Sequence, residues 1–350
     1  MNFFKEKSVF ITGHTGFKGA WMCEVLKRLG ANVTGFALAP ESGCVFDVLN
    51  VGRGMQSFIG DVRDFDSLEK AIGAAQPEIV FHLAAQPLVL DSYKRPVYTF
   101  ETNVMGTVNL LECVLAVGGV RSVVVVTTDK VYRNDEQAKG FCEDDKLGGN
   151  DPYSSSKACA ELVSSSYSAS FFRDSGIALS TARAGNVIGG GDIAENRIIP
   201  DCVRAARAGE AVFLRNPDAV RPYQHVLEPV FAYMQIAQRQ WENPGLADSY
   251  NIGSNEQDGV TTENLVSVFC QKWGNGMKWK AALVKDAPYE SGLLYLDCNK
   301  IKRALGWRPV WDIEMAVEKT VEWEKARLSG EFAGCTHRQI DEYMEGATCV

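Results

Sequence analysis

The feature that most constrains this chain is a regular alternation of short apolar runs and amphipathic segments over its first half. The predicted strands are the apolar runs at 8–12, 31–38, 55–61, 78–85 and 122–126. The predicted helices are the segments at 16–30, 66–75, 96–118 and 153–174. Near-continuous apolar strands alternating with helices favour an α/β fold, with a doubly wound parallel sheet covered by helices on both faces.

The pattern loosens after a sixth strand predicted at 177–189. Helices are expected near 200–208, 227–240, 262–273, 298–305 and 313–328, with loops at 189–192, 215–222 and 253–262. We therefore expect a Rossmann-type NAD-binding domain at residues 1–187. A smaller, mixed C-terminal substrate-binding domain is expected at residues 188–350, with some of its segments returning to the first domain.

The composition is that of an ordinary soluble globular protein, with 46% hydrophobic and 23% charged residues among 350. A net charge of −8 argues against broad binding to nucleic acid or anionic membranes, but it allows a local basic pocket. No apolar run reaches the roughly 20 residues of a membrane span, and the N-terminus has no secretory pattern. Ten cysteines without a CxxC pair and four histidines without metal-like spacing predict reduced thiols, no metal site and a cytoplasmic location.

The first loop, "TGHTGFKG", places Gly13, Gly16 and Gly19 between a predicted strand and a predicted helix. Glycines there allow a tight turn and close approach of a pyrophosphate, while the helix N-terminus supplies free N–H groups. The loop predicts dinucleotide binding, the alternative being glycines that serve only the turn. The other expected cofactor contacts are Thr15, Phe17, Asp61, Val62, Leu83, Ala84 and Ala85, together with the catalytic Tyr153 and Lys157.

Asp61 ends the third predicted strand, where its carboxylate could accept from an adenine amino group or cap the following turn. The small side chains of Ala84 and Ala85 allow the cofactor to approach the backbone. We expect NAD rather than NADP, although the second strand ends without the acidic residue that would bind a ribose 2′-hydroxyl. No arginine stands there to bind a 2′-phosphate.

The stretch "DPYSSSKACAEL" places Tyr153 and Lys157 four residues apart, on one face of a helix. A lysine ammonium and a positively charged nicotinamide would favour the tyrosine phenolate, which could take a proton from an alcohol. Thr128, at a strand end, could hydrogen-bond the same hydroxyl. YxxxK alone also fits an exposed helical pair, but together with the glycine loop it predicts a dehydrogenase-type site. Beside Thr128, "TTDKVY" sets a carboxylate, Asp129, next to an amine, Lys130.

These motifs resemble the extended short-chain dehydrogenase/reductase superfamily. "GHTGFKG", "TTDK" and "VRPYQHVLEP" are similar to a narrower group, its sugar-nucleotide 4,6-dehydratase branch acting on CDP-glucose, and matching stretches run through two thirds of the chain. The resemblance implies NAD as cofactor and conversion of CDP-D-glucose to its 4-dehydro-6-deoxy form with loss of water, for O-antigen synthesis. It also implies a homodimer, in which the apolar faces of helices 96–118 and 153–174 pair across a two-fold axis.

The resemblance implies catalytic roles for Thr128, Asp129, Lys130, Tyr153 and Lys157. Tyr153 would be the base at the sugar C4 hydroxyl, and Asp129 would protonate the departing C6 hydroxyl. Lys130, which occupies the place of a glutamate in dTDP-glucose dehydratases, could be the C5 base, a charged stabiliser of the enolate or only the partner of Asp129. The expected substrate-binding residues are Gln86, Asn186, Arg197, Arg215 and Arg221. Asn186 and Arg221 match positions that face the diphosphate, and arginine can clamp a phosphate with two hydrogen bonds. Arg197 and Arg215 rank lower, because each could equally be an exposed charge.

Two alternative functions fit part of the sequence. A sugar-nucleotide 4-epimerase or decarboxylase needs the Thr128, Tyr153 and Lys157 set but no acid–base pair for losing water, so Asp129 and Lys130 favour a dehydratase. A cofactor-sensing protein without catalysis is disfavoured by the intact set. His82 and His225 are predicted to be packed core histidines, and Asn103 a structural residue. The nucleotide base is not indicated by any contact that the residues themselves reveal.

Overall fold

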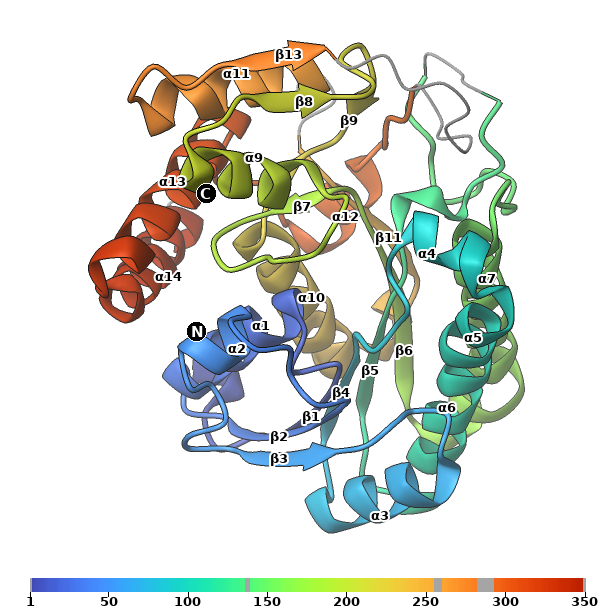
Figure 1. Ribbon diagram of the computed structural model, residues 1–350. Coiled ribbons are helices and arrows are strands. Elements are labelled where there is room, and N and C mark those ends of the chain that lie inside the picture. Colours follow the sequence, from blue (N-terminus) through green and yellow to red (C-terminus); the bar gives the residue numbers. More distant parts are fainter. Residues whose placement is uncertain (1, 136–138, 255–259, 282–292, 349–350) are drawn as a thin grey trace.

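A seven-stranded sheet forms the centre of the computed structural model, which describes residues 2–135, 139–254, 260–281 and 293–348 (Figure 1). Its strands are β1 (Ser8–Thr12), β2 (Asn32–Ala37), β3 (Gln56–Ile59), β4 (Ile79–His82), β5 (Ser122–Val126), β6 (Ala178–Ala184) and β11 (Ser249–Ile252). All neighbours pair in parallel, in the order β11-β6-β5-β4-β1-β2-β3. The strand order reverses between β1 and β4, and in such sheets ligands bind beyond the carboxyl ends of the strands at that point. The predicted fold class is confirmed.

Helices cover both faces of the sheet, as its continuous apolar strands require (Figure 1). Helices α1 (Phe17–Arg28) and α10 (Leu227–Glu242) lie on one face, and α3 (Phe65–Ala75), α6 (Gly106–Val117) and α7 (Pro152–Tyr167) on the other. Strand β5 shows why: Val124 packs in the core formed with α1 and α10, while Val123 and Val125 pack in the core formed with α3 and α6.

The sixth predicted strand, 177–189, is not continuous, so that prediction was wrong. β6 ends at Ala184, and the chain resumes as β7 (Val187–Ile188), which pairs with β10 (Gln224–His225). The reason is close packing at Gly185, where a Cβ would lie 2.7 Å from the carbonyl oxygen of Pro222. The break turns the chain out of the sheet and directs Asn186 toward the cleft described below.

Segments beyond residue 187 complete the sheet. β11 pairs with β6 at the edge, and α10 packs on β5 and β6. The first and second halves of the chain therefore share one sheet and one core. The division into a cofactor domain at 1–187 and a substrate domain at 188–350 stays a prediction.

The predicted helices of the second half are present as α9 (Ile198–Ala208), α10, α11 (Thr262–Trp273), α12 (Asn299–Leu305) and α13 (Ile313–Ser329). The last helix, α14 (Phe332–Thr348), was not predicted. The unpredicted short elements include α2 (Val45–Val48), α4 (Val89–Lys94), β8 (Val212–Leu214), β9 (Val220–Arg221), β12 (Val260–Thr261) and β13 (Trp279–Ala281). Of the predicted loops, 189–192 is a loop, 215–222 contains β9, and 253–262 lies partly outside the described residues.

Both long helices predicted in the first half contain a π-helical turn. The segment 96–118 consists of α5 (Pro96–Phe100), a π-helical turn at Glu101–Met105 and α6. The segment 153–174 consists of α7, a second such turn at Ser168–Phe172 and α8 (Arg173–Ser175). Among the described residues, no helix is both long enough and apolar enough to cross a bilayer.

Candidate active site

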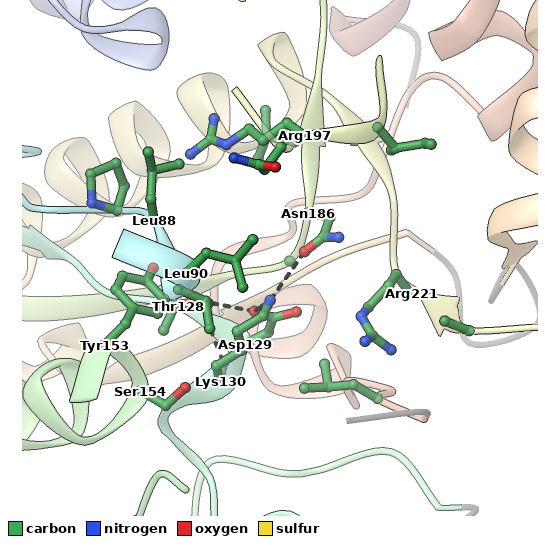
Figure 2. Close-up of a pocket in the computed structure, with 18 of the residues that line it drawn as sticks. Leu88, Leu90, Thr128, Asp129, Lys130, Tyr153, Ser154, Asn186, Arg197 and Arg221 are labelled. Atoms are coloured by element: carbon green, nitrogen blue, oxygen red, sulfur yellow. Dashed lines mark hydrogen bonds and ion pairs between the residues drawn. The ribbon is translucent and has the colours of Figure 1, made fainter. Parts of the chain in front are cut away.

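A cavity of about 580 Å³ opens at the carboxyl edge of the sheet, where β5, β6 and the start of α7 meet. Thr128, Asp129 and Lys130 follow β5, Tyr153 lies in the first turn of α7, and Asn186 follows β6. Figure 2 shows their side chains gathered on one side of the cavity. Residues that are far apart in the sequence thus form one site, as expected for a parallel sheet whose carboxyl ends share an edge.

Local hydrogen bonds hold the two segments that carry these side chains. Thr128 caps the short 3₁₀ helix Asp129–Val131, accepting from the Lys130 N–H and donating to Asp129 Oδ1 at 2.9 Å. Asp151 caps α7 by accepting from the Ser154 N–H at 2.9 Å, with Pro152 in the first turn. These caps set where Thr128 and Tyr153 stand relative to the cleft.

Tyr153 and Lys157 are both buried, with 8% and 5% of their surface exposed. Burial lowers the pKa of Lys157 to about 8, against the opposing charge of Glu161. Burial also raises the pKa of Tyr153 to about 12, a shift that the hydrogen bond with Thr128 opposes and the charge of Asp129 increases. Without a bound nicotinamide the Tyr153 phenol therefore keeps its proton at neutral pH, and the phenolate predicted beside the charged cofactor stays a prediction. The ammonium of Lys157 instead donates to the Val126 carbonyl at 3.0 Å.

Lys130 and Asp129 form the acid–base neighbours that the sequence placed side by side. Lys130 Nζ lies 3.1 Å from Asp129 Oδ1 and 3.1 Å from Asn186 Oδ1, the two contacts drawn in Figure 2. Asp129 is 1% exposed, and its second oxygen, Oδ2, has no hydrogen-bond partner among the described residues. An unpaired buried oxygen is costly, so this one is available to a ligand or a proton.

Four of the five predicted substrate-binding residues line the cleft: Asn186, Arg197, Arg215 and Arg221. Arg197 pairs with Asp192 at 3.1 Å, and Arg221 donates to the Val220 carbonyl at 2.9 Å. In Figure 2, Arg197 lies above Asn186 and Arg221 lies below it to the right. Their guanidinium groups supply the basic surface that an anionic ligand needs within a protein of negative net charge.

Gln86 is the predicted substrate residue that does not line the cleft. It is 4% exposed, and its amide donates to Thr99 and accepts from the Leu88 N–H. Its backbone N–H donates to Asn103 Oδ1, and Asn103 Nδ2 donates in turn to the Gln86 carbonyl and to Ser156 Oγ. Gln86 and Asn103 thus connect the loop after β4 to α5 through Thr99 and to α7 through Ser156. This is the structural role predicted for Asn103.

The glycine loop forms a compact cradle at the switch point between β1 and β4. Gly13 has φ +76°, and a Cβ on it would lie 2.6 Å from the Ala84 nitrogen; a Cβ on Gly19 would lie 2.2 Å from the Gly13 oxygen. The turn therefore admits only glycine at both positions. Helix α1 begins after Gly16 with no side-chain cap and no acidic residue in its first turn. A helix N-terminus built in this way fits the pyrophosphate of a dinucleotide.

The remaining predicted cofactor residues surround this cradle. Thr15 Oγ1 donates to the Leu38 carbonyl, holding the loop against the end of β2. The N–H groups of Leu83 and Ala84 donate to the backbone and hydroxyl oxygens of Thr12, which fixes the chain after β4, where Ala85 follows. Val62 packs on Gly106, and Phe17 lines the cleft. These contacts hold Thr15, Leu83 and Ala84 in place near the loop, and their shared role in binding a cofactor stays a prediction.

Asp61 stands at the end of β3 with its carboxylate already engaged. It accepts from the Arg63 backbone N–H at 2.9 Å and from the Arg63 guanidinium. Burial alone would raise the pKa of Asp61, but these hydrogen bonds outweigh it and keep the pKa below its ordinary value. The carboxylate is therefore ionised at neutral pH and keeps acceptor positions, so its proposed contact with an adenine amino group stays a prediction.

Comparison with known proteins identifies the family. Residues 10–320 match the family described as GDP-mannose 4,6 dehydratase. A CDP-glucose 4,6-dehydratase from Salmonella typhimurium is 44% identical over 99% of this chain and 99% of its own length. The chain belongs to this dehydratase family.

Solved structures agree with this family in fold. A UDP-glucose 4-epimerase of Thermus thermophilus, solved in complex with NAD, superposes with a TM-score of 0.78 and 26% identity, over 91% of this chain and 98% of that one. A dTDP-glucose 4,6-dehydratase of Bacillus anthracis, solved with NAD, gives a TM-score of 0.77 over 92% of this chain and 97% of its own. At 22% identity the second likeness shows the fold alone.

Lys18 is a site residue that the sequence did not reveal. It lies within the glycine loop sequence, between Phe17 and Gly19, it lines the cleft, and its Nζ lies 5.9 Å from the centre of the Tyr233 ring on α10. Its burial and the charges of Lys157 and Arg197 lower the pKa of Lys18 to about 7. A lysine at the start of an otherwise apolar helix face was the available signal. Its side chain adds a further titratable amine to the cleft of this member of the dehydratase family.

The predictions for two histidines are confirmed. His82 is buried, with its ring nitrogens hydrogen-bonded to Thr12 and Thr107. His225 is fully buried and packs edge-on against Trp21 and Trp311. Burial lowers the pKa of both to about 3, so both rings are neutral core residues.

Proposed function

We propose that this protein converts CDP-D-glucose to CDP-4-dehydro-6-deoxy-D-glucose with loss of water, as an NAD-dependent 4,6-dehydratase. The observation that carries the proposal is the Asp129–Lys130 pair beside Thr128, Tyr153 and Lys157 in one cleft. An epimerase shares this fold but has no use for an acid and a base at C5 and C6. The likeness to a CDP-glucose 4,6-dehydratase over the full chain supports the choice of nucleotide.

The cradle of Gly13, Gly16 and Gly19 fits NAD, which accepts the hydride from sugar C4 and returns it to C6 when bound. The chain itself handles the protons. Tyr153 takes the C4 hydroxyl proton. Thr128 forms a hydrogen bond with the Tyr153 hydroxyl, which holds the two side chains together. Because the pKa of Tyr153 is about 12 without ligand, the phenolate must be stabilised by positive charge when the site is loaded. Lys157, buried beneath the site, supplies part of that charge.

The elimination needs one acid and one base, and Asp129 with Lys130 can provide both. Moving one Lys130 proton to the unpaired Asp129 Oδ2 turns the ion pair into a carboxylic acid beside a neutral amine, and the 3.1 Å contact of Lys130 with Asp129 Oδ1 is kept. The amine can then take the C5 proton while Asp129 protonates the C6 oxygen, which leaves as water. Charged Lys130 stabilising the C4 enolate, with water as the base, is the other active role. In both roles Lys130 acts in the elimination of water and not in the oxidation at C4.

Substrate binding rests on the basic residues of the cleft. Arg221 and Arg215 suit the diphosphate, because a guanidinium can donate two parallel hydrogen bonds to phosphate oxygens. Arg197 is a lower-ranked candidate, since its ion pair with Asp192 would have to be shared with a ligand.

A homodimer is part of the proposal. Exposed apolar side chains lie on the outer helices: Val97, Phe100 and Met105 on α5 and the π-helical turn, Leu162 on α7, and Phe171 on the second π-helical turn. Apolar side chains gathered on neighbouring helices mark a protein interface. Pairing of these helices with those of a second copy would cover them. We also propose a cytoplasmic location and a role in the supply of deoxysugars for O-antigen.

The function is tested by assaying the purified protein with CDP-, UDP-, dTDP- and GDP-glucose and following water loss by mass spectrometry. We expect the CDP-sugar to be dehydrated fastest, with a catalytic amount of NAD supporting many turnovers, because the reaction is redox-neutral overall. Stoichiometric accumulation of NADH alongside product would contradict the dehydratase and indicate net oxidation. A shift in sugar configuration without water loss would indicate an epimerase.

A further inference from the structure

The break after β6 places Asn186 where an uninterrupted strand could not. At Gly185 the chain passes so close to Pro222 that no side chain fits. The Gln224 N–H then donates to the Asn186 carbonyl at 3.0 Å, so β10 fixes the backbone from outside the central sheet. Asn186 is therefore held in the cleft by packing that has nothing to do with a ligand.

The hydrogen bonds of Asn186 define which way its amide faces. Lysine is only a donor when charged, and Lys130 Nζ lies 3.1 Å from Asn186 Oδ1, so the amide oxygen faces Lys130. The amide nitrogen is left to face the hydroxyl of Tyr223, which also hydrogen-bonds the Asn186 side chain. Tyr223 is itself buried, and its hydroxyl is 3.4 Å from Thr262 Oγ1. The amide is thus anchored at one end and offers its oxygen to Lys130 at the other.

Lys130 is consequently held by two acceptors, Asp129 Oδ1 and Asn186 Oδ1, each at 3.1 Å. Three of the four tetrahedral positions on its nitrogen are then used, one by the bond to Cε and two by N–H groups. In the neutral amine the fourth position is the lone pair. Asp129 alone would leave the amine free to rotate about a single contact, but a second acceptor fixes the direction of that lone pair.

We propose that Asn186 is a positioning residue for Lys130, holding the amine so that its free position meets the C5 proton of the sugar. The inference rests on the proposed function. In the step concerned, the C5–H bond breaks, its electron pair conjugates with the C4 carbonyl, and the proton goes to the Lys130 nitrogen. The C6–O bond breaks as Asp129 supplies a proton and water leaves. Lys130 returns its proton to C5 when C6 receives the hydride.

The test compares Asn186→Ala with Arg221→Ala in deuterated solvent, with NAD and saturating CDP-glucose. For Asn186→Ala we expect NADH to form at the wild-type rate, while deuterium entry at C5 and water loss fall on the order of 10–100-fold. Arg221→Ala should raise KM and leave the ratio of the two steps unchanged, as loss of a phosphate contact would. Asn186→Asp keeps an oxygen facing Lys130, so it should restore C5 exchange at saturation even though its charge weakens substrate binding.

Each outcome decides between the positioning role and simple diphosphate binding. If Asn186→Ala only raises KM, or if Asn186→Asp eliminates water more slowly than Asn186→Ala at saturation, the positioning role is overturned. If the wild-type protein forms neither NADH nor product from CDP-glucose, the proposed function itself has failed and the inference falls with it. Thermal unfolding of both Asn186 variants separates these results from misfolding, and Asn186→Ser replaces the alanine variant if that one does not fold.

Discussion

Two buried ionic clusters lie close together near the carboxyl ends of β5 and β6, and they are built in opposite ways. In the deeper one, the Glu161 carboxylate accepts from Thr127, Thr181 and Arg183, so both of its oxygens are used. In the cleft, Asp129 uses one oxygen for Lys130 and leaves the other without a partner among the described residues. The Glu161 cluster, fully paired, ties α7 to the strand ends. The Asp129 cluster keeps the spare hydrogen-bonding capacity that proton transfer requires.

The largest expected effect on the rate is that of Tyr153→Phe, which removes a hydroxyl from the cleft that contains the Asp129 cluster. We expect NADH formation from C4 to slow by about 10²–10⁴-fold, the range typical of losing a general base. Stability should change little, because the ring and its packing remain. Stopped-flow absorbance of a single turnover measures the step, and thermal unfolding is the control. An unmodified rate of NADH formation would show that Tyr153 is not the base.

Lys130→Ala should separate the two chemical steps, because Lys130 contacts the acid of the second step and not the phenol of the first. NADH should still form, while water loss and C5 exchange in deuterated solvent fall by about 10²-fold or more. Lys130→Arg then distinguishes base from stabiliser, since a guanidinium stays protonated. Elimination rescued by arginine would favour the charged role, and elimination lost in both variants would favour the amine base. Wild-type elimination in Lys130→Ala would leave Lys130 without a catalytic role.

Substitutions in the Glu161 cluster should lower the free energy of unfolding, whereas substitutions in the cleft should lower the reaction rate. Glu161→Leu leaves the Arg183 guanidinium buried without its carboxylate, and breaking such a pair costs about 3–5 kcal/mol. Asp129→Asn should cost less than about 1 kcal/mol, because its partner Lys130 is a quarter exposed, yet it should abolish elimination. Urea unfolding of both variants checks the contrast. Equal losses of stability would mean that the two clusters are not built for different purposes.

The contrast also explains what the sequence could and could not reveal. The strands of the first half, the glycine cradle and the caps before Tyr153 follow from local patterns, because each depends on neighbours in the chain. The end of β6 depends on Pro222, and the environment of Lys18 depends on Tyr233, Arg197 and Lys157. These contacts join distant segments, so no local pattern contains them.

Two site predictions show what residue type and spacing leave out. Gln86 stands beside the cofactor loop in sequence, yet its amide is taken up by Thr99 and Leu88. The phenolate of Tyr153 is predicted beside both Lys157 and a positively charged nicotinamide. In the protein without ligand, burial raises the pKa of Tyr153 to about 12 and Lys157 donates to the Val126 carbonyl, so the phenolate stays a prediction. Residue type and spacing predicted which groups meet, whereas burial and competing hydrogen bonds decide their state.

The smallest expected effect is a change in the pKa of Lys157 when the charge of Glu161 is removed. Glu161 and Lys157 lie one helical turn apart on α7, so they connect the Glu161 cluster with the cleft. Burial lowers the pKa of Lys157 to about 8, and the charge of Glu161 opposes that shift. Glu161→Gln keeps the side-chain shape but removes the charge, so the pKa of Lys157 should fall further, by on the order of one unit or less. Charged Lys157 favours the Tyr153 phenolate, so the loss of C4 oxidation at high pH should begin at lower pH in this variant.

The measurement is the single-turnover rate of NADH formation between about pH 6 and pH 10, a range that covers the ionisation of Lys157. Glu314→Gln, an exposed substitution on α13, is the matched control and should reproduce the wild-type profile. Below the pKa of Lys157 the Glu161→Gln and wild-type rates should agree, because the lysine is charged in both. Profiles of the two glutamine variants that superpose over the whole range would show that the Glu161 cluster holds the fold without tuning the cleft.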